Sequence, residues 1–590
     1  MRASALCSAL IRTPGPTHRK WANASPITPD CDSIGAVGSD RIPTLLGGLV
    51  APVKRAVSAA TALAALAGLT AYAPSAATAQ VPGPPRRPPA APVWKSCHSA
   101  AFPKLWCASV EVPLDYAHPD GRKITLALSQ VPHTAKESLG PLLVNPGGPG
   151  GSGLALPGLV AEALPAAVSA RYDIIGFDPR GVGKSEPALN CEPGHFKSVR
   201  PDPVPHSGAE ENANIERAAS FAKACGSGKY GKLLEHIDTV DAVKDIDAVR
   251  AALRAMRISY FGYSYGTYLG AVYAKLFPQR VRRLVLDSIV DPTGVWYDNN
   301  LNQDYAFDAR FKAFTAWIAK ADSVYHLGSD PGKVEAAWYA VHDALRTRPA
   351  GGKVGPGEFE DTFVPGGYYN GYWPDLATAL AAYVNKGNEK PLVTLYGNNV
   401  TVDAAGDNGY SVYTAVQCRD AQWPRSWQTW HRDTQEVYEK APFLAWNNTW
   451  YNAPCAFWPT GSRRPVDVSN SQLPATLLFQ ATEDAATPYS GGVIMHSLLK
   501  KSSLVVEEGG GNHGITLSGS KCLDGYLSAY LATGKVPRGH GGTADAICQK
   551  LPDPVAAAAA AVPAKAAAAA SGPAPATGDK GLHKLLGTRG

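Results

Sequence analysis

The chain has 590 residues, of which 45% are hydrophobic and 18% are charged, and its formal net charge is +6. One hydrophobic core rarely extends beyond about 250–300 residues, so this length predicts more than one structural unit. The charge excess is small, and no stripe of Lys and Arg interleaves with aromatic residues. A nucleic-acid-binding protein is therefore not expected.

The N-terminal region has the pattern of a secretory signal. Lys54 and Arg55 precede an uncharged run rich in Ala and Leu, and the sequence A-T-A ends at Ala79. A basic segment, an apolar segment and an A-x-A site are typical of a cleaved signal peptide. A transmembrane anchor is the alternative, but the apolar run of about 16 residues is short for a span of about 20. We expect a secreted protein that begins near Gln80, with no stable membrane insertion and with cell-wall association left open.

Cysteine usage agrees with export. Eight cysteines follow Gln80, and an even number in an exported chain favours disulfides. Pairing each cysteine with its nearest neighbour closes only local loops, which gives the set that we expect: Cys97–Cys107, Cys191–Cys225, Cys418–Cys455 and Cys522–Cys548. A metal site is the alternative, but no C-x-x-C or paired His/Cys cluster is present, so no metal and no cofactor are expected.

After a proline-rich linker, short apolar strand patterns alternate with helical ones. V-E-V-P-L-D-Y and K-I-T-L-A-L-S-Q-V predict an antiparallel pair, and P-L-L-V-N, Y-D-I-I-G-F, I-S-Y-F-G, R-L-V-L-D and T-L-L-F-Q-A predict buried strands. The helical pattern V-D-A-V-K-D-I-D-A-V-R lies between two of them. This alternation predicts an α/β fold with a mostly parallel sheet flanked by helices, the arrangement of an α/β-hydrolase.

The alternation breaks between Asp291 and about Pro474, where Trp and Tyr are frequent and the helical patterns are amphipathic. The return of strand patterns afterwards favours a helical cap inserted into the fold over an independent module. The expected organisation is residues 1–79 N-terminal extension and signal, 80–95 linker, 96–295 first part of the core, 296–470 cap, 471–551 second part of the core and 552–590 an Ala/Pro-rich low-complexity tail.

The motif Gly262-Tyr-Ser264-Tyr-Gly266 follows one predicted strand and precedes a helical pattern. This is the context of a nucleophile elbow, in which a serine stands on a tight turn between strand and helix. The motif alone is weak, because glycine is frequent in this chain, and its context gives it weight. We predict that Ser264 is a nucleophile.

A serine nucleophile needs a base within hydrogen-bonding reach. His513 lies in a glycine-rich loop after the strand pattern S-L-V-V-E-E and is the expected base, and His540 is the weaker candidate. The acid that orients the histidine should lie between serine and histidine in this fold. Asp484 fits, because it follows the strand T-L-L-F-Q-A, whereas Asp287 is the runner-up and is interpreted as a structural acid.

Acyl transfer also needs donors for a developing oxyanion. The run P-G-G-P-G-G-S-G after P-L-L-V-N is expected to supply one backbone N–H, at Gly148, and Tyr265 the other. A phosphate-binding loop is the alternative, but no Gly-Lys-Ser/Thr follows.

Together the motifs N-P-G-G-P-G-G-S-G, D-I-I-G-F-D-P-R-G, Y-F-G-Y-S-Y-G-T-Y-L-G, A-T-E-D-A-A-T-P and G-N-H-G resemble the secreted tripeptidyl aminopeptidases of actinobacteria. These belong to the proline iminopeptidase-like branch of the α/β-hydrolases, serine peptidase family S33. The resemblance covers about Trp94 to Leu551. It implies release of short peptides, often tripeptides, from free N-termini, and it places nucleophile, acid and base at Ser264, Asp484 and His513. The chain departs from the family at Glu483, where Leu or a similar residue is usual.

An exopeptidase of this branch needs a carboxylate to hold the substrate's ammonium group, because a buried cation needs a partner. The candidates are acids of the expected cap: Glu358, Glu360, Asp361 and Asp420. Aromatic residues of the cap are candidates for a peptide groove, although core packing explains them equally well: Tyr372, Trp373, Trp423 and Trp446.

The expected function is that of a secreted serine exopeptidase acting on peptides or proteins with free N-termini. A secreted carboxylesterase or lipase with the same triad is the second hypothesis, and a non-catalytic cell-wall protein is the third. The sequence gives no prediction of oligomeric state.

Overall fold

The computed structural model describes residues 89–400, 403–539, 542–557, 582–583 and 585–586. The predicted signal, the start of the linker, most of the C-terminal tail and His540 lie outside these residues. Within them, no helix is both long enough and apolar enough to cross a membrane.

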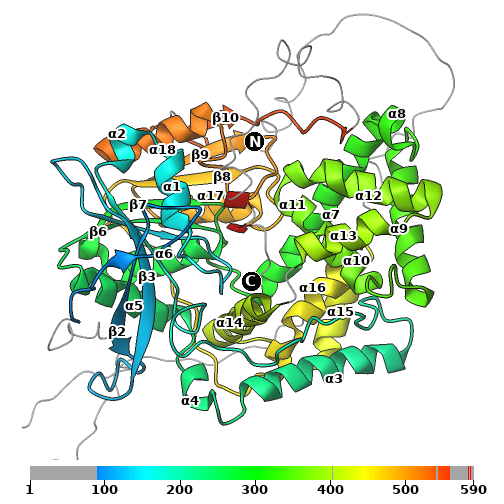
Figure 1. The fold of residues 1–590 in the computed structure, drawn as a ribbon, viewed down its shortest axis with the longest axis horizontal. Coiled ribbons are helices and arrows are strands. Elements are labelled where there is room, and N and C mark those ends of the chain that lie inside the picture. The colour runs from blue at the N-terminus through cyan, green and yellow to red at the C-terminus, as the bar shows by residue number, and fades with distance from the viewer. Residues whose placement is uncertain (1–88, 401–402, 540–541, 558–581, 584, 587–590) are drawn as a thin grey trace, which may run out of the picture. The chain divides into compact units, whose positions relative to one another are not determined.

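A ten-stranded sheet forms the centre of the fold, in the order β1-β2-β3-β5-β4-β6-β7-β8-β9-β10 (Figure 1). The pairs β1/β2, β2/β3 and β3/β5 are antiparallel, and every other neighbouring pair is parallel. The strands are β1 Lys95–Ser96, β2 Trp106–Pro113, β3 Lys123–Val131, β4 Pro141–Asn145, β5 Asp173–Phe177, β6 Ile258–Tyr263, β7 Val281–Asp287, β8 Thr476–Ala481, β9 Ser502–Glu508 and β10 Ala546–Gln549.

The burial of the strands follows from their place in the sheet. All six residues of β6 and of β8 are buried, because helices cover both faces of the parallel region. The predicted antiparallel pair is confirmed as β2 and β3, and each of the five predicted core strands is present as β4 to β8. The short strand β10 at the far edge was not predicted.

The helices of the core form two layers. Helices α5, α6 and α17 share one apolar cluster, and α1 and α18 share another on the opposite side of the sheet. The helices outside the insertion are α1 Leu156–Ala163, α2 Ala166–Ser169, α3 Gly208–Cys225, α4 Gly231–Leu234, α5 Thr239–Ala252, α6 Tyr265–Leu276, η1 Pro278–Arg280, α17 Tyr489–Leu498 and α18 Lys521–Thr533. A mostly parallel sheet with helices on both faces confirms the predicted fold class.

The chain between β7 and β8 is helical, and the described residues of this insertion contain no strand. Its own apolar core is rich in aromatic side chains such as Phe311, Trp338 and Phe363. Its helices are α7 Tyr297–Lys320, α8 Asp322–Tyr325, α9 Pro331–Thr347, α10 Pro356–Phe363, α11 Pro365–Tyr368, η2 Asn370–Tyr372, α12 Trp373–Lys386, α13 Lys390–Asn399, α14 Ala404–Asp420, α15 Trp427–Tyr438, α16 Ala445–Asn452 and η3 Ala453–Phe457. We call this insertion the cap.

Helix α3 belongs to the connection between β5 and β6 but packs against the cap, and it lies below α15 and α16 in the view of Figure 1. Its Ala218 shares an apolar cluster with Trp446 and Trp450 of α16. Arg200, in the same connection, pairs with Glu358 and Asp361 of α10. The connection between β5 and β6 therefore contributes contacts to the cap as well as to the main core cluster.

The four disulfides are those expected from nearest-neighbour pairing: Cys97–Cys107, Cys191–Cys225, Cys418–Cys455 and Cys522–Cys548. They close loops of 10, 34, 37 and 26 residues. The prediction from cysteine count and spacing is confirmed.

Candidate active site

Ser264 stands on the turn between β6 and α6 with φ 56° and ψ −129°, a backbone conformation that a side-chain-bearing residue rarely adopts. Its neighbours must be small, because a Cβ on Gly262 would collide with the carbonyl group of Gly266. The Ser264 N–H donates to the carbonyl oxygen of Asp287 at 3.1 Å, which ties the turn to β7. This is the strand–turn–helix geometry of a nucleophile elbow.

His513 and Asp484 form a buried pair. The Nδ1 atom of His513 lies 3.0 Å from Oδ1 and 2.9 Å from Oδ2 of Asp484, and each residue is 1% exposed. The loop after β8 fixes the carboxylate, since Oδ1 accepts the N–H groups of Ala486 and Thr487 at 3.0 Å each. The Thr487 hydroxyl donates to Oδ2 at 3.0 Å. With both oxygens engaged, the carboxylate is oriented to hold the Nδ1 edge of the imidazole ring.

The other ring nitrogen, Nε2 of His513, is buried and has no hydrogen-bond partner within the described part of the chain. In hydrolases without substrate, the bond between serine and histidine is often long and forms only in the reacting complex. The arrangement therefore has the histidine–aspartate bond in place and leaves Nε2 to receive a proton.

Asp287 lies at the end of β7, fully buried, and holds the chain that follows His513. Its carboxylate accepts the N–H of Ile515 at 3.1 Å, and the N–H and hydroxyl of Thr516 at 2.8 and 2.5 Å. Ser288 beside it accepts the Gly514 N–H at 2.7 Å. Burial raises the pKa of Asp287, and the bonds from Thr516 oppose that rise. These contacts fit the structural role expected for this runner-up acid.

Glu483 precedes the acid but does not disturb it. Its side chain is 54% exposed and lies 4.0 Å from Nη1 of Arg310, and its N–H donates to the Gly510 carbonyl at 2.8 Å. The departure from the family pattern therefore leaves the hydrogen bonds of Asp484 intact.

The glycine loop after β4 lies directly against the elbow. A Cβ on Gly147, which has φ +97°, would meet the Ser264 Cβ and the backbone nitrogen of Tyr265. Gly147 donates to Oδ1 of Asn145 at 3.0 Å, which fixes the start of the loop. Gly148 and Tyr265 both line the cleft that contains Ser264. The loop is thus placed for the oxyanion role expected of these two backbone N–H groups.

The far end of the glycine loop is held by the buried Asp178. Its Oδ1 accepts the Ser152 hydroxyl at 2.6 Å and the Gly153 N–H at 3.1 Å. Oδ2 accepts the Lys184 N–H at 2.8 Å. Burial raises the pKa of Asp178, and these bonds oppose the rise. The motif D-P-R-G after β5 thus serves to hold the loop opposite the elbow.

The cleft beside Ser264 has about 1050 Å³ of space, part of it open to solvent. The core forms its floor, and α7, α14 and α16 of the cap form much of its wall. Many wall residues carry amides: Asn299, Asn300, Asn302, Gln303, Gln417 and Asn448. Among the described lining residues, Asp291 supplies the one carboxylate.

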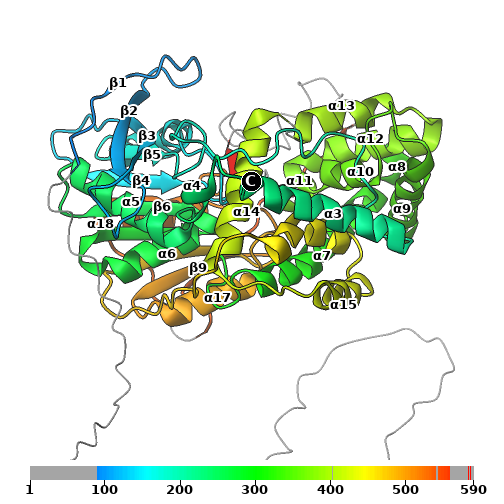
Figure 2. The same ribbon diagram turned by 90° about the horizontal axis from the view of Figure 1, so that it is seen from below.

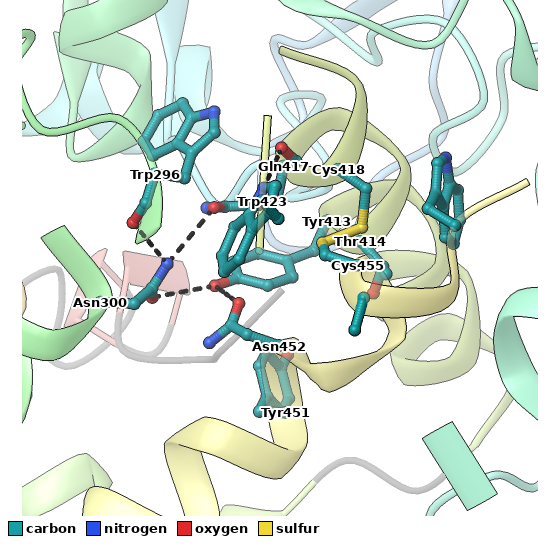
Figure 3. Close-up of a disulfide and its surroundings, with 12 residues drawn as sticks. Trp296, Asn300, Tyr413, Thr414, Gln417, Cys418, Trp423, Tyr451, Asn452 and Cys455 are labelled. Carbon is teal, nitrogen blue, oxygen red and sulfur yellow. Dashed lines mark hydrogen bonds between the residues drawn. A yellow bond between two sulfur atoms is a disulfide. The ribbon is translucent and has the colours of Figure 1, made fainter. Parts of the chain in front are cut away.

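A hydrogen-bonded network orders part of this wall (Figure 3). Asn300 donates to the Trp296 carbonyl at 2.9 Å and to Oε1 of Gln417 at 3.4 Å. Tyr413 donates to Oδ1 of Asn452 at 2.9 Å. The Cys418–Cys455 disulfide lies beside the network and joins α14, which presents Tyr413 and Gln417, to η3, which directly follows Asn452.

The structure does not bring the four acids predicted to hold an ammonium group to this cleft. Glu358 and Asp361 pair with Arg200, and Glu360 lies 3.0 Å from Nε2 of His342. Asp420 accepts the N–H of Thr239 at 2.8 Å and its hydroxyl at 2.5 Å. Each carboxylate already has a partner within the protein, and none lines the cleft.

The four predicted groove aromatics are also absent from the lining. Trp373, Trp423 and Trp446 are at most 3% exposed and pack in apolar clusters, as the core-packing alternative held. The aromatic residues that do line the cleft are Trp296, Phe307, Tyr368, Tyr413 and Tyr451, together with Tyr265 of the elbow.

Sequence reasoning missed the amide wall. A signal was available in the run D-N-N-L-N-Q-D at the start of α7, where Asn299 and Gln303 are four residues apart and so share one face of the helix. It also missed Leu585 and Leu586, which line the cleft from a part of the tail expected to be low-complexity. Across the described residues, no group of three His, Cys, Asp or Glu side chains is arranged to hold a metal ion.

Comparison with known proteins agrees with this geometry. A family model described as "alpha/beta hydrolase fold" matches residues 140–519. A tripeptidyl aminopeptidase of Streptomyces lividans is 41% identical over 455 residues, covering 75% of this chain and 84% of the relative. Serine protease Hip1 of Mycobacterium tuberculosis is 34% identical, and the match covers 73% of this chain and 86% of the relative. Carboxylesterase B of the same species is 30% identical, and the match covers 80% of this chain and 95% of the relative. The chain is therefore a serine hydrolase that belongs to the α/β-hydrolase family, in the group that includes the actinobacterial tripeptidyl aminopeptidases.

Proposed function

We propose that this chain is an exported serine exopeptidase that releases short peptides, chiefly tripeptides, from free N-termini through an acyl-enzyme on Ser264. The observation that carries the proposal is the buried His513–Asp484 pair, at 2.9 Å, on loops next to the elbow that bears Ser264. The 41% identity with a protein named tripeptidyl aminopeptidase supports the substrate class.

In the proposed reaction, Ser264 Oγ attacks the scissile carbonyl carbon while Nε2 of His513 accepts its proton. Asp484 holds the ring through Nδ1 and stabilises the imidazolium that forms. The N–H groups of Gly148 and Tyr265 donate to the developing oxyanion. His513 then protonates the leaving amine, and water, deprotonated by the same histidine, hydrolyses the acyl-enzyme.

The cleft lining has one carboxylate that suits a free N-terminus, and a second carboxylate lies on α7 outside the described lining. Asp291 lies on the lining, and Asp304 is buried on α7, where its Oδ1 accepts from the Asn448 amide at 3.0 Å. We assign the substrate's ammonium group to this region in place of the acids predicted from sequence. The surrounding amides offer donors and acceptors for the peptide groups of a short N-terminal stretch.

Export is supported by two independent features. The sequence before Gln80 has the pattern of a signal peptide, and the four disulfides belong to an oxidising compartment. Mass spectrometry of the secreted protein should find a mature N-terminus at or near Gln80.

The test compares a tripeptidyl chromogenic amide that has a free N-terminus with its N-acetylated twin, using wild type and Ser264→Ala. Cleavage of the free form alone, lost in the variant, is expected.

A carboxylesterase is the second candidate, favoured by the relative named carboxylesterase B. Turnover of p-nitrophenyl esters that depends on Ser264, with neither amide cleaved, would replace the peptidase proposal with that one.

A further inference from the structure

The cleft that contains Ser264 is lined in part by residues from the C-terminus of the chain. We use "C-terminal segment" for Leu582, His583, Leu585 and Leu586. Leu585 and Leu586 line the same cleft as Gly148, Ser264 and Tyr265. Figures 1 and 2 show the red fragments of this segment between the sheet and the cap helices.

The segment is buried against the core. Leu582 is 3% exposed and Leu586 is 5% exposed, and both belong to the apolar cluster that contains Tyr263, Ile515 and Leu517. Leu586 occupies the space over the backbone of Gly514, where an added Cβ would collide with it. Since Gly514 directly follows His513, this leucine lies against the loop that carries the histidine.

His583 makes a second, independent contact. Its ring stacks on Tyr369 with the centroids 3.9 Å apart and the planes at 7°, and it is 1% exposed. Tyr368, next to Tyr369, contacts His513 in two ways. Its carbonyl accepts the backbone N–H of His513 at 2.7 Å, and the two rings meet edge-on with their centroids 5.4 Å apart. The C-terminal segment thus contacts the surroundings of His513 from both the core side and the cap side.

The chain before the segment runs along the cap. The Trp317 indole donates to the Pro554 carbonyl at 2.9 Å, and the Ala557 N–H donates to the Tyr325 hydroxyl at 3.2 Å. An alanine- and proline-rich stretch of sequence, residues 558–581, connects this part to the leucines. A low-complexity tail that docks nowhere leaves its side chains exposed to solvent. Leu582 and Leu586 are instead buried near His513.

We propose that the C-terminal segment is an intramolecular ligand of the active-site cleft, which narrows it and competes with substrate for the apolar surface around Gly514 and Tyr369. This inference rests on the proposed function of Ser264 but makes a separate claim about access to it. It implies that the cleft accepts leucine side chains next to His513, and that release of the segment opens the site.

The first experiment measures the rate at which a fluorophosphonate probe labels Ser264 in the full chain and in a chain that stops after Ala557. Removal of the segment should raise the labelling rate, and kcat/KM for the tripeptidyl amide, about fivefold or more if the segment is docked in most molecules. The double variant Leu582→Asp/Leu586→Asp in the full chain should show the same rise without any deletion. Val555→Asp is the matched control, because Val555 lies in the same tail but is 69% exposed.

A synthetic peptide with the sequence of residues 581–590 should slow labelling of the shortened chain competitively, and its Leu→Asp counterpart should not. Equal labelling rates in the full chain, the shortened chain and the double variant would overturn the docking proposal while leaving Ser264 as nucleophile. Failure of all three proteins to label would instead remove the proposed function.

Discussion

Two buried aspartates near His513 have different roles, although Asp287 ends one strand of the parallel region and Asp484 follows another. Asp484 contacts the ring at Nδ1, whereas Asp287 contacts the backbone at Ile515 and Thr516. Changing each to asparagine preserves its size and removes its charge. The two changes should therefore separate orientation of the ring from support of the loop.

Asp484→Asn should lower kcat by about 10⁴-fold, because an amide that donates to Nδ1 selects the wrong tautomer of His513. Its free energy of unfolding should change little, since Oδ1 of asparagine still accepts from Ala486 and Thr487. Asp287→Asn should lower the free energy of unfolding by about 2–4 kcal/mol, because its NH₂ group would face backbone N–H donors. Urea unfolding and steady-state kinetics of both variants measure the two effects.

Asp120→Asn is the control, because Asp120 is exposed, and it should change neither quantity. A large loss of kcat in Asp287→Asn with unchanged stability would mean that Asp287 acts on the ring after all.

The residues that follow a strand could be predicted from the sequence, whereas the partners of the cap acids could not. Asp484 and His513 were located because strand order fixes which loops meet at one edge of a parallel sheet. Glu358 was misjudged because its partner, Arg200, is 158 residues away and belongs to another connection. Sequence alone does not reveal whether a carboxylate is already neutralised by such a partner.

Among the elements, α14 has two roles, since it forms part of the cleft wall and is joined to η3 by Cys418–Cys455. Tyr413 and Gln417, which point into the network of Figure 3, lie within five residues of the disulfide. The bridge should therefore affect the order of the wall as well as global stability.

Replacing both Cys418 and Cys455 by serine should raise KM for the tripeptidyl amide several-fold and lower stability by about 2–4 kcal/mol. Replacing Cys522 and Cys548, which join α18 to β10 at the sheet edge, should lower stability without changing KM. Comparison of KM and of the thermal midpoint for the two double variants tests this. An equal rise of KM in both would show that the effect comes from stability alone.

Sequence patterns predicted most strands but not the packing partners of the helices. Strand patterns located β2 to β9, because short aliphatic runs bounded by turn residues are typical of buried strands. Helix α3 packs in two directions, because Ala218 shares a cluster with α16 whereas Phe221 belongs to the main core cluster, and its burial pattern does not say which partner covers which residue. An amphipathic helix specifies a buried face and leaves its neighbour open.

For the molecule as a whole, Asp420 joins the cap to the catalytic core. It ends α14, and it accepts two bonds from Thr239 at the start of α5. The Thr239 hydroxyl in turn lies 2.7 Å from the hydroxyl of Tyr265, the residue after Ser264. Burial, reinforced by the negative charge of Asp238, raises the pKa of Asp420 to about 7.

This raised pKa predicts how stability depends on pH. The ordinary value for Asp is about 3.9, so the folded state holds this proton more tightly than the unfolded state. The stabilisation is complete below about pH 4 and is lost as pH rises through about 7. Asp420→Asn has no proton to lose, and relative to this variant the wild type should lose up to about 3 kcal/mol between pH 5 and pH 8.

Urea unfolding of both proteins at pH 5, 6.5 and 8 measures the difference, and Asp120→Asn should follow the wild type at each pH. The loss should not depend on catalysis, so it should persist in a Ser264→Ala background. Parallel stability curves for wild type and Asp420→Asn would mean that Asp420 is ionised in the folded state at no cost. In that case the contact between cap and elbow would not depend on pH.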